Sequence, residues 1–148
     1  MSKLPSILLV EDDPNDVELT LMALAESHLA NEVIVARDGE EALNYLYCRG
    51  SYESREAGNP PVVLLDLKLP KVDGLEVLSQ VKNDPDLRRI PVVMLTSSRE
   101  ERDLLRSYDL GTNAYVIKPV GFQEFVDAVR EVGLFWGVIN QPPLESGE

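Results

Sequence analysis

The stretch PPVVLLDLKLP, residues 60–70, decides the fold, because four apolar residues, 62–65, run directly into Asp66. A short unbroken run of valine and leucine is typical of a strand buried on both faces of a parallel sheet covered by helices. A carboxylate at the end of such a strand is costly to bury without a partner. The position of Asp66 therefore raises the question of what this group does there.

Four other short apolar runs accompany this one, and apolar residues at helical spacing separate them. The predicted strands cover residues 6–10, 32–36, 62–66, 91–96 and 114–117. The predicted helices cover about 14–28, 40–47, 74–82, 98–110 and a last segment from about 122. Five strand–helix units with right-handed crossovers predict an α/β fold: a doubly wound, five-stranded parallel sheet in a three-layer sandwich.

Local signals mark the ends of these elements. Asp13 followed by Pro14 is typical of a helix N-cap with proline at the first helical position. The tetrapeptide SREE from Ser98 is a capping box, and Gly111 marks where that helix should stop. The polar segment 48–61 is rich in helix breakers and is predicted to be a loop. The expected inward positions of the third helix are Leu75, Leu78 and Val81.

Composition limits the class of protein. The chain has 148 residues, 44% of them hydrophobic, which fits one domain with a real core. A single cysteine, Cys48, excludes an internal disulfide and favours a cytoplasmic location. Apolar runs are too short to cross a bilayer. The net charge of −12 argues against nucleic acid or an anionic membrane as a direct partner and is compatible with bound cations.

Polar side chains follow four of the predicted strands. Glu11 and Asp12 follow the first strand, Asp66 the third, Thr96 the fourth and Lys118 the fifth. These strand ends share one edge of a parallel sheet, where ligands bind in such folds. Clustered carboxylates repel one another unless a cation joins them, and oxygen-only ligands select a hard ion such as Mg²⁺. Mg²⁺, a lysine and a hydroxyl together suit a phosphoryl group, and Asp66 is then the candidate nucleophile.

Each of these side chains also has a plainer interpretation when it is taken alone. A carboxylate can start a turn or lie solvated in a loop, a threonine can cap a helix, and a lysine before proline can lie in a surface turn. For Asp13 the helix cap is the favoured interpretation. Five such coincidences at one sheet edge are much less plausible than a single site.

Four separated motifs carry a resemblance to a known family. These are ILLVEDDPND (7–16), VVLLDLKLPKVDGLEVL (62–78), IPVVMLTSS (90–98) and AYVIKPV (114–120). In order and spacing they resemble the CheY-like receiver domain of two-component response regulators, over about residues 5–132. The resemblance implies a flavodoxin-like sheet order of 2-1-3-4-5. It also implies one receiver domain over residues 1–148, with an extension at about 133–148.

The resemblance implies a metal site and a phosphoacceptor. Asp66 corresponds to the phosphoacceptor, Asp12 to a direct Mg²⁺ ligand and Glu11 to a second acid that acts through water. The backbone carbonyl of Lys68 corresponds to a further metal ligand.

The resemblance also implies a switch. Thr96 corresponds to the hydroxyl that moves to bind the phosphoryl group, and Tyr115 to the aromatic side chain that follows this movement. Lys118 is expected to bind a phosphoryl oxygen, and the Lys118–Pro119 peptide bond is expected to be cis. The output surface would be the helix 98–110, the strand 114–117 and the last helix.

Two segments resemble one subfamily, the single-domain regulators paired with cyanobacterial and bacterial phytochromes. They are the loop 48–61 and the ending GLFWGVINQPP, residues 133–143. Such regulators receive phosphate from a light-sensing histidine kinase and tend to form homodimers. Apolar side chains beyond the expected core also favour self-association, although the tail could instead fold back on its own domain. They are Leu134, Phe135, Trp136, Val138 and Ile139.

The expected function is that of a phosphorylation-driven signalling protein rather than a metabolic enzyme. It would catalyse only its own phosphorylation and slow dephosphorylation. Three alternatives remain open. A flavodoxin-like nucleotide binder would need a first loop friendlier to phosphate than VEDDPND. A small aspartyl-phosphate phosphatase would normally have an acid at position 68, where this chain has lysine. A docking module that works without phosphorylation would tolerate loss of Asp66.

Overall fold

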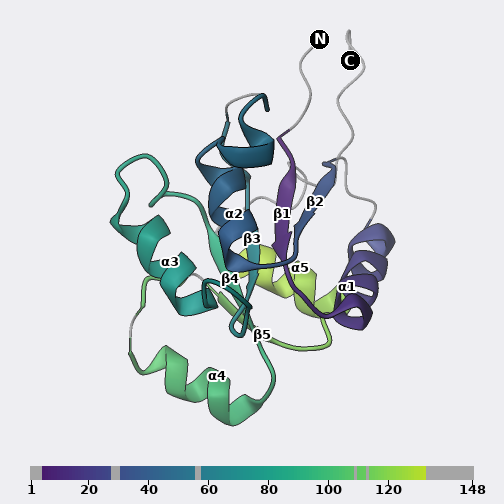
Figure 1. Cartoon of the computed structure of the whole chain (residues 1–148). Helices are drawn as coiled ribbons and strands as arrows, with labels where there is room; N and C mark the ends of the chain where they lie inside the picture. Colours follow the sequence, from purple (N-terminus) through teal and green to yellow (C-terminus); the bar gives the residue numbers. More distant parts are fainter. Residues whose placement is uncertain (1–4, 28–30, 56–57, 109, 113, 133–148) are drawn as a thin grey trace, which may run out of the picture.

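The computed structural model describes residues 5–27, 31–55, 58–108, 110–112 and 114–132. Its centre is a five-stranded parallel sheet with the order β2-β1-β3-β4-β5 (Figure 1). The strands are β1 Ile7–Val10, β2 Val33–Ala36, β3 Val63–Asp66, β4 Val92–Thr96 and β5 Ala114–Ile117. The predicted strands, their parallel arrangement and the 2-1-3-4-5 order are confirmed.

Helices cover both faces of the sheet and make it the middle layer of three (Figure 1). They are α1 Pro14–Glu26, α2 Gly39–Leu46, α3 Gly74–Asn83, α4 Arg99–Arg106 and α5 Phe122–Glu131. Alternate residues of β1 point to opposite faces: Leu8 and Val10 pack with α2, α3 and α4, whereas Ile7 and Leu9 pack with α1 and α5. Burial on both faces explains why these strands are continuously apolar.

The register of the strands determines which side chains meet at the carboxyl edge. Val10 lies beside Leu65, so the next residues along each strand, Glu11 and Asp66, are neighbours. Asp66 in turn lies beside Leu95. The backbone N–H of Lys118 donates to the carbonyl of Thr96 at 2.7 Å, which ties the end of β5 to the end of β4.

The segment 48–61 is not an entirely irregular loop, because it contains a 3-10 helix, η1, at Gly50–Tyr52. Side chains fix this turn against α2. The Tyr52 hydroxyl donates to Glu41 Oε2 at 2.7 Å, and its ring packs edge-on against Tyr45 with 5.1 Å between centroids. Arg55 Nε donates to the Tyr45 carbonyl oxygen at 2.7 Å. Breaker residues predicted the interruption, but these longer-range contacts order it.

The ends and faces of two helices differ from the prediction. Leu75 is 37% exposed, and the inward residues of α3 are Val77, Leu78 and Val81. The prediction for Leu75 was wrong because Gly74, the first residue of α3, packs directly under β3 and turns Leu75 outward. Helix α4 ends at Arg106, before Gly111.

The predicted capping box at α4 is confirmed in part. Ser98 Oγ accepts from the N–H of Glu101 at 3.1 Å. The Glu101 carboxylate returns to the N–H of Ser97 at 2.8 Å rather than to the cap residue itself.

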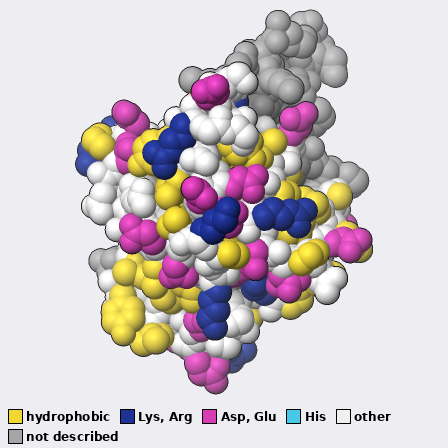
Figure 2. All heavy atoms as spheres, viewed as in Figure 1, with side chains coloured by type: hydrophobic (Ala, Val, Ile, Leu, Met, Phe, Trp, Pro, Cys, Tyr) yellow, Lys and Arg dark blue, Asp and Glu magenta, His cyan; other side chains and the backbone are white. Residues whose placement is uncertain are grey.

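The surface carries charges of both signs. On the face in Figure 2, the Lys and Arg side chains lie among Asp and Glu side chains. None of the helices in the described ranges is long and apolar enough to span a lipid bilayer.

The contact between α3 and β3 supplies a stability test. A Cβ at residue 74 would overlap the Asp66 carbonyl oxygen and lie 2.6 Å from that of Leu67. Backbone atoms cannot rotate away, so we expect Gly74→Ala to lower the free energy of unfolding by about 3 kcal/mol. Urea denaturation measures the change.

Gly121→Ser is the matched control for this substitution. Its Cβ would meet only the flexible end of Glu124, and serine is a favoured helix cap. We expect the control to stay within about 1 kcal/mol of the wild type. Equal stability of the two variants would contradict the close-contact argument.

Candidate functional site at the carboxyl edge of the sheet

Three carboxylates converge where β1 and β3 end. One oxygen from each of Glu11, Asp12 and Asp66 lies within 4.8 Å of the others. Glu11 and Asp66 are buried, with 0% and 4% of their surface exposed, and Asp12 is open to solvent. The structure thus brings together the three acidic side chains that the sequence predicted as a metal site.

Glu11 is held by two hydrogen bonds. Its Oε2 accepts from the backbone N–H of Asp13 at 3.1 Å, and its Oε1 accepts from Lys118 Nζ at 3.2 Å. Burial raises the pKa of Glu11 to about 7, and the nearby Asp66 charge adds to the rise. The Asp13 N–H and the Lys118 charge act in the opposite direction. Without a bound cation, Glu11 therefore takes up a proton near neutral pH.

Asp66 is a buried carboxylate with a direct cationic partner. Its Oδ1 lies 3.2 Å from Lys118 Nζ. Burial raises the pKa of Asp66, whereas the Lys118 charge, the contact with Glu11 and a hydrogen bond from the Lys68 N–H favour the ionised form. A carboxylate must be ionised to act as a nucleophile, and these three partners act in that direction, against the larger effect of burial.

Lys118 lies at the centre of the charge arrangement. Its Nζ contacts Glu11 Oε1 at 3.2 Å, Asp16 Oδ2 at 3.0 Å and Asp66 Oδ1 at 3.2 Å. Burial lowers the pKa of Lys118, but the hydrogen bond to Asp16 and the charges of Asp66 and Glu11 outweigh this and raise it. The ammonium is therefore permanently charged at physiological pH.

Sequence reasoning missed Asp16. This residue is the acid in the first turn of α1, next to a cap that already explained the local pattern. Asp13 is that cap, as predicted: its Oδ1 accepts from the N–H groups of Asn15 at 2.8 Å and Asp16 at 3.1 Å. Asp16 lies four residues after Asp12, and this spacing could have indicated that both face the same site. Side chains in the first turn of a helix tilt toward its N-terminus, which here points them back toward the strand ends.

Thr96 and Tyr115 lie on the side of the site nearest α4. The Thr96 hydroxyl is fully buried and lies 3.5 Å from the carbonyl oxygens of Ser98 and Val116. The Tyr115 hydroxyl donates to the Leu105 carbonyl oxygen of α4 at 3.4 Å. The Arg106 guanidinium lies 5.7 Å from the centroid of the Tyr115 ring. Tyr115 is therefore attached to α4 at both its hydroxyl and its ring.

The remaining predicted residues divide into two groups. The Lys68 side chain points outward, with its ammonium 4.0 Å from the Glu101 carboxylate, while the Lys68 N–H donates to Asp66. The metal-binding role of the Lys68 carbonyl stays a prediction. The Lys118–Pro119 peptide bond is cis, as predicted. The predicted dimer contacts lie outside the described residues: Leu134, Phe135, Trp136, Val138 and Ile139.

A parallel sheet of order 2-1-3-4-5, with paired acids, a strand-end aspartate, a threonine and a lysine at one edge, defines a receiver-type signalling domain. Comparison with protein families agrees: the chain belongs to the response regulator receiver domain family, which matches residues 7–130. Proteins of this family are signalling proteins of two-component systems.

Individual relatives include regulators associated with phytochromes. A solved structure of the bacteriophytochrome response regulator AtBRR is 64% identical, covers 95% of this chain and 100% of its own, and has a TM-score of 0.89. Response regulator Rcp1 of Synechocystis sp. is 43% identical over 88% of this chain and 87% of its own length. A phosphorylated cyanobacterial phytochrome response regulator, RcpA, is 46% identical over 84% and 88% of the two chains, with a TM-score of 0.69.

The acidic cluster fits a divalent cation. All its donors are carboxylate oxygens, which suit hard ions, and two of the three are buried beside a repelling neighbour. A Mn²⁺-bound structure of Rcp1 is 40% identical, covers 97% of this chain and 100% of its own, and has a TM-score of 0.72. Receiver domains bind a divalent metal ion through such a cluster.

Metal binding should depend on pH through Glu11. Its pKa is about 7 in the folded protein and 4.5 ordinarily, so a cation must displace a proton below pH 7. We expect the affinity for Mn²⁺ to rise about tenfold between pH 6 and pH 8, measured by electron paramagnetic resonance of the free ion. Glu11→Gln should bind more weakly and with a flatter pH profile.

The raised pKa of Glu11 also makes the stability of the metal-free protein depend on pH, and stability changes in the direction opposite to metal affinity. Because the folded state holds the Glu11 proton more tightly than the unfolded state, this group lowers stability as pH rises from about 4.5 to about 7.

Wild-type Mn²⁺ affinity that is equal at pH 6 and pH 8 would contradict the assignment of the proton to Glu11.

Proposed function

We propose that Asp66 accepts a phosphoryl group from a histidine kinase in a reaction that requires Mg²⁺. The observation that carries this proposal is the buried Asp66 carboxylate, which lies 3.2 Å from Lys118 and converges with Glu11 and Asp12. This combination supplies a nucleophile, a fixed cation and a metal site within one edge of the sheet. The phosphorylated state of the relative RcpA supports it.

The transfer balances as a displacement at phosphorus. An Asp66 oxygen forms a bond to phosphorus while the P–N bond of the kinase phosphohistidine breaks, and the imidazole leaves with the electron pair. Lys118 moves its hydrogen bond from the carboxylate to a phosphoryl oxygen. A bound Mg²⁺ supplies neutralisation of the charge that develops on the transferring oxygens.

Hydrolysis of the phosphorylated Asp66 limits the lifetime of the signal. Water attacks phosphorus, the bond from phosphorus to the Asp66 oxygen breaks, and inorganic phosphate leaves. We infer that the domain catalyses only these two reactions on itself and does not turn over a separate substrate.

Output then follows from rearrangement beside the site. The Thr96 hydroxyl has long contacts of 3.5 Å, so moving it to a phosphoryl oxygen costs little. Tyr115 is held by α4 and borders a cavity of about 300 Å³ between α4, β5 and α5, which Arg102 and Glu131 also line. A movement of Thr96 would therefore reach the surface that we assign to protein partners.

The similarity to AtBRR supports a bacterial phytochrome kinase as the donor. The apolar residues of the tail support a homodimer; they are Leu134, Phe135, Trp136, Val138 and Ile139. We place the protein in the cytoplasm as one receiver domain with a C-terminal extension.

Phosphorylation by a small donor tests the central claim. Incubation with acetyl phosphate and Mg²⁺ should add one phosphoryl group that is stable in acid and lost in base, detected by mass spectrometry of the intact protein. Asp66→Asn should abolish the adduct, and chelation of Mg²⁺ with EDTA should prevent it.

Asp13→Asn is the control for this experiment, because asparagine preserves the helix cap and leaves the acceptor intact. It should be phosphorylated like the wild type. Turnover of an organic phosphate without a lasting adduct would instead identify a phosphatase. An unmodified wild-type protein would favour a docking module.

Self-association is tested separately by light scattering. We expect the intact chain to be a dimer at micromolar concentration, and Trp136→Ala or a chain that ends at Val132 to be monomeric. A monomeric wild type at high concentration would rule out this role for the tail.

A further inference from the structure

Three carboxylates contact the Lys118 ammonium, and one of them, Asp16, is not part of the site that the sequence predicted. An ammonium has three hydrogens to donate, and here each has a carboxylate acceptor. Two of these, Glu11 and Asp66, belong to the group of converging acids that suits a divalent ion. Asp16 lies 3.0 Å from the ammonium, the shortest of the three contacts, and is not in that group among the described residues.

Binding of a divalent cation at Glu11 and Asp66 would bring a second positive charge close to Lys118. A divalent ion held by Glu11 and Asp66 shares both carboxylates with Lys118, so two positive charges lie close together and repel. Asp16 contacts the lysine from outside the metal group and offsets that repulsion. Resting on the proposed metal-dependent function, we propose that Asp16 supplies the negative charge that lets the Lys118 ammonium and a divalent ion occupy the site together.

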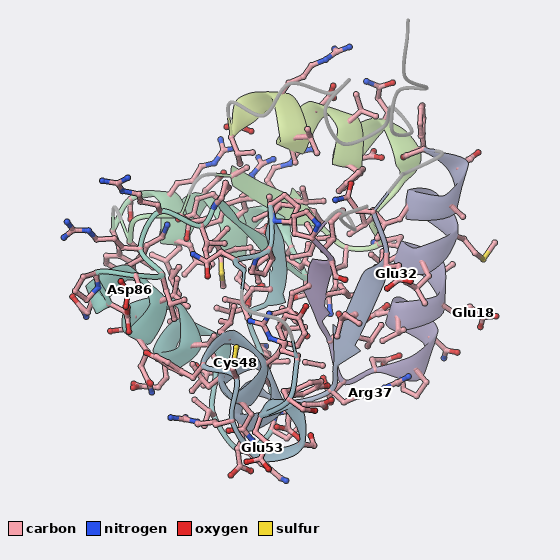
Figure 3. All side chains as sticks on the ribbon, turned by 90° about the horizontal axis from the view of Figure 1, so that it is seen from above. Glu18, Glu32, Arg37, Cys48, Glu53 and Asp86 are labelled. Atoms are coloured by element: carbon pink, nitrogen blue, oxygen red, sulfur yellow. The ribbon has the colours of Figure 1, made fainter. Side chains whose placement is uncertain are left out.

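The geometry distinguishes Asp16 from other acids of α1. Asp16 has a side chain 28% exposed that points back to Lys118, whereas Glu18, two residues further along the helix, is exposed and points away from the domain (Figure 3). Lys118 is itself only 16% exposed, which weakens solvent screening of the pair. Glu18→Gln is therefore a control that removes the same charge from the same helix.

The test measures Mn²⁺ affinity by electron paramagnetic resonance at pH 8. We expect Asp16→Asn to weaken binding roughly fivefold and Glu18→Gln to weaken it less than about 1.5-fold. In a Lys118→Gln background, the effect of Asp16→Asn should fall below about twofold, because Asp16 acts through the lysine. Thermal melts followed by circular dichroism check the fold, and Asp16→Ser provides a second charge-removing variant.

Two outcomes overturn the inference. Equal affinities of Asp16→Asn and Glu18→Gln would reduce Asp16 to an ordinary surface charge. An undiminished effect in the Lys118→Gln background would show that Asp16 does not act through the lysine. By contrast, a wild-type protein without Mn²⁺ affinity would count against the proposed function itself, so the two failures are distinguishable.

Discussion

The structure depends on a charge balance at one edge of a parallel sheet. The fold delivers Glu11 and Asp66 to adjacent positions because β1 and β3 pair in a register that places Val10 beside Leu65. Burial of two neighbouring carboxylates is unfavourable, and the protein offsets part of this cost with one ammonium that contacts both. The remaining imbalance makes the edge receptive to a divalent cation and, with it, to a phosphoryl group.

Lys118 is linked to the neighbouring strand by its backbone as well as to the acids by its charge. Its N–H donates to the Thr96 carbonyl, so the residue that pairs with the acids is linked directly to the strand that carries the hydroxyl. Tyr115 lies on the neighbouring strand and is bound to α4 through its hydroxyl. Charge at Asp66, the position of Thr96 and the packing of α4 are therefore connected by a short series of contacts.

The sequence was sufficient for the fold and for most of the site, for physical reasons that differ between residues. Continuous apolar strands identified a covered parallel sheet, and strand ends in such a sheet must share an edge, so Glu11, Asp12 and Asp66 followed. Asp16 was missed because a helix cap already accounted for the acids around it, although its four-residue spacing from Asp12 places it in the first turn of α1. Leu75 was misplaced because periodicity does not show where a glycine lets a helix approach a strand.

The segment 48–55, which contains the 3-10 helix η1, is joined to α2 by side-chain contacts. Tyr52 donates to one oxygen of Glu41, and the other oxygen accepts from the N–H of Arg37 at the end of β2. The Arg55 guanidinium lies 4.1 Å from the centroid of the Tyr45 ring. The segment 48–55 therefore packs against α2, and its removal would expose both the Tyr45 ring and the Glu41 carboxylate to solvent.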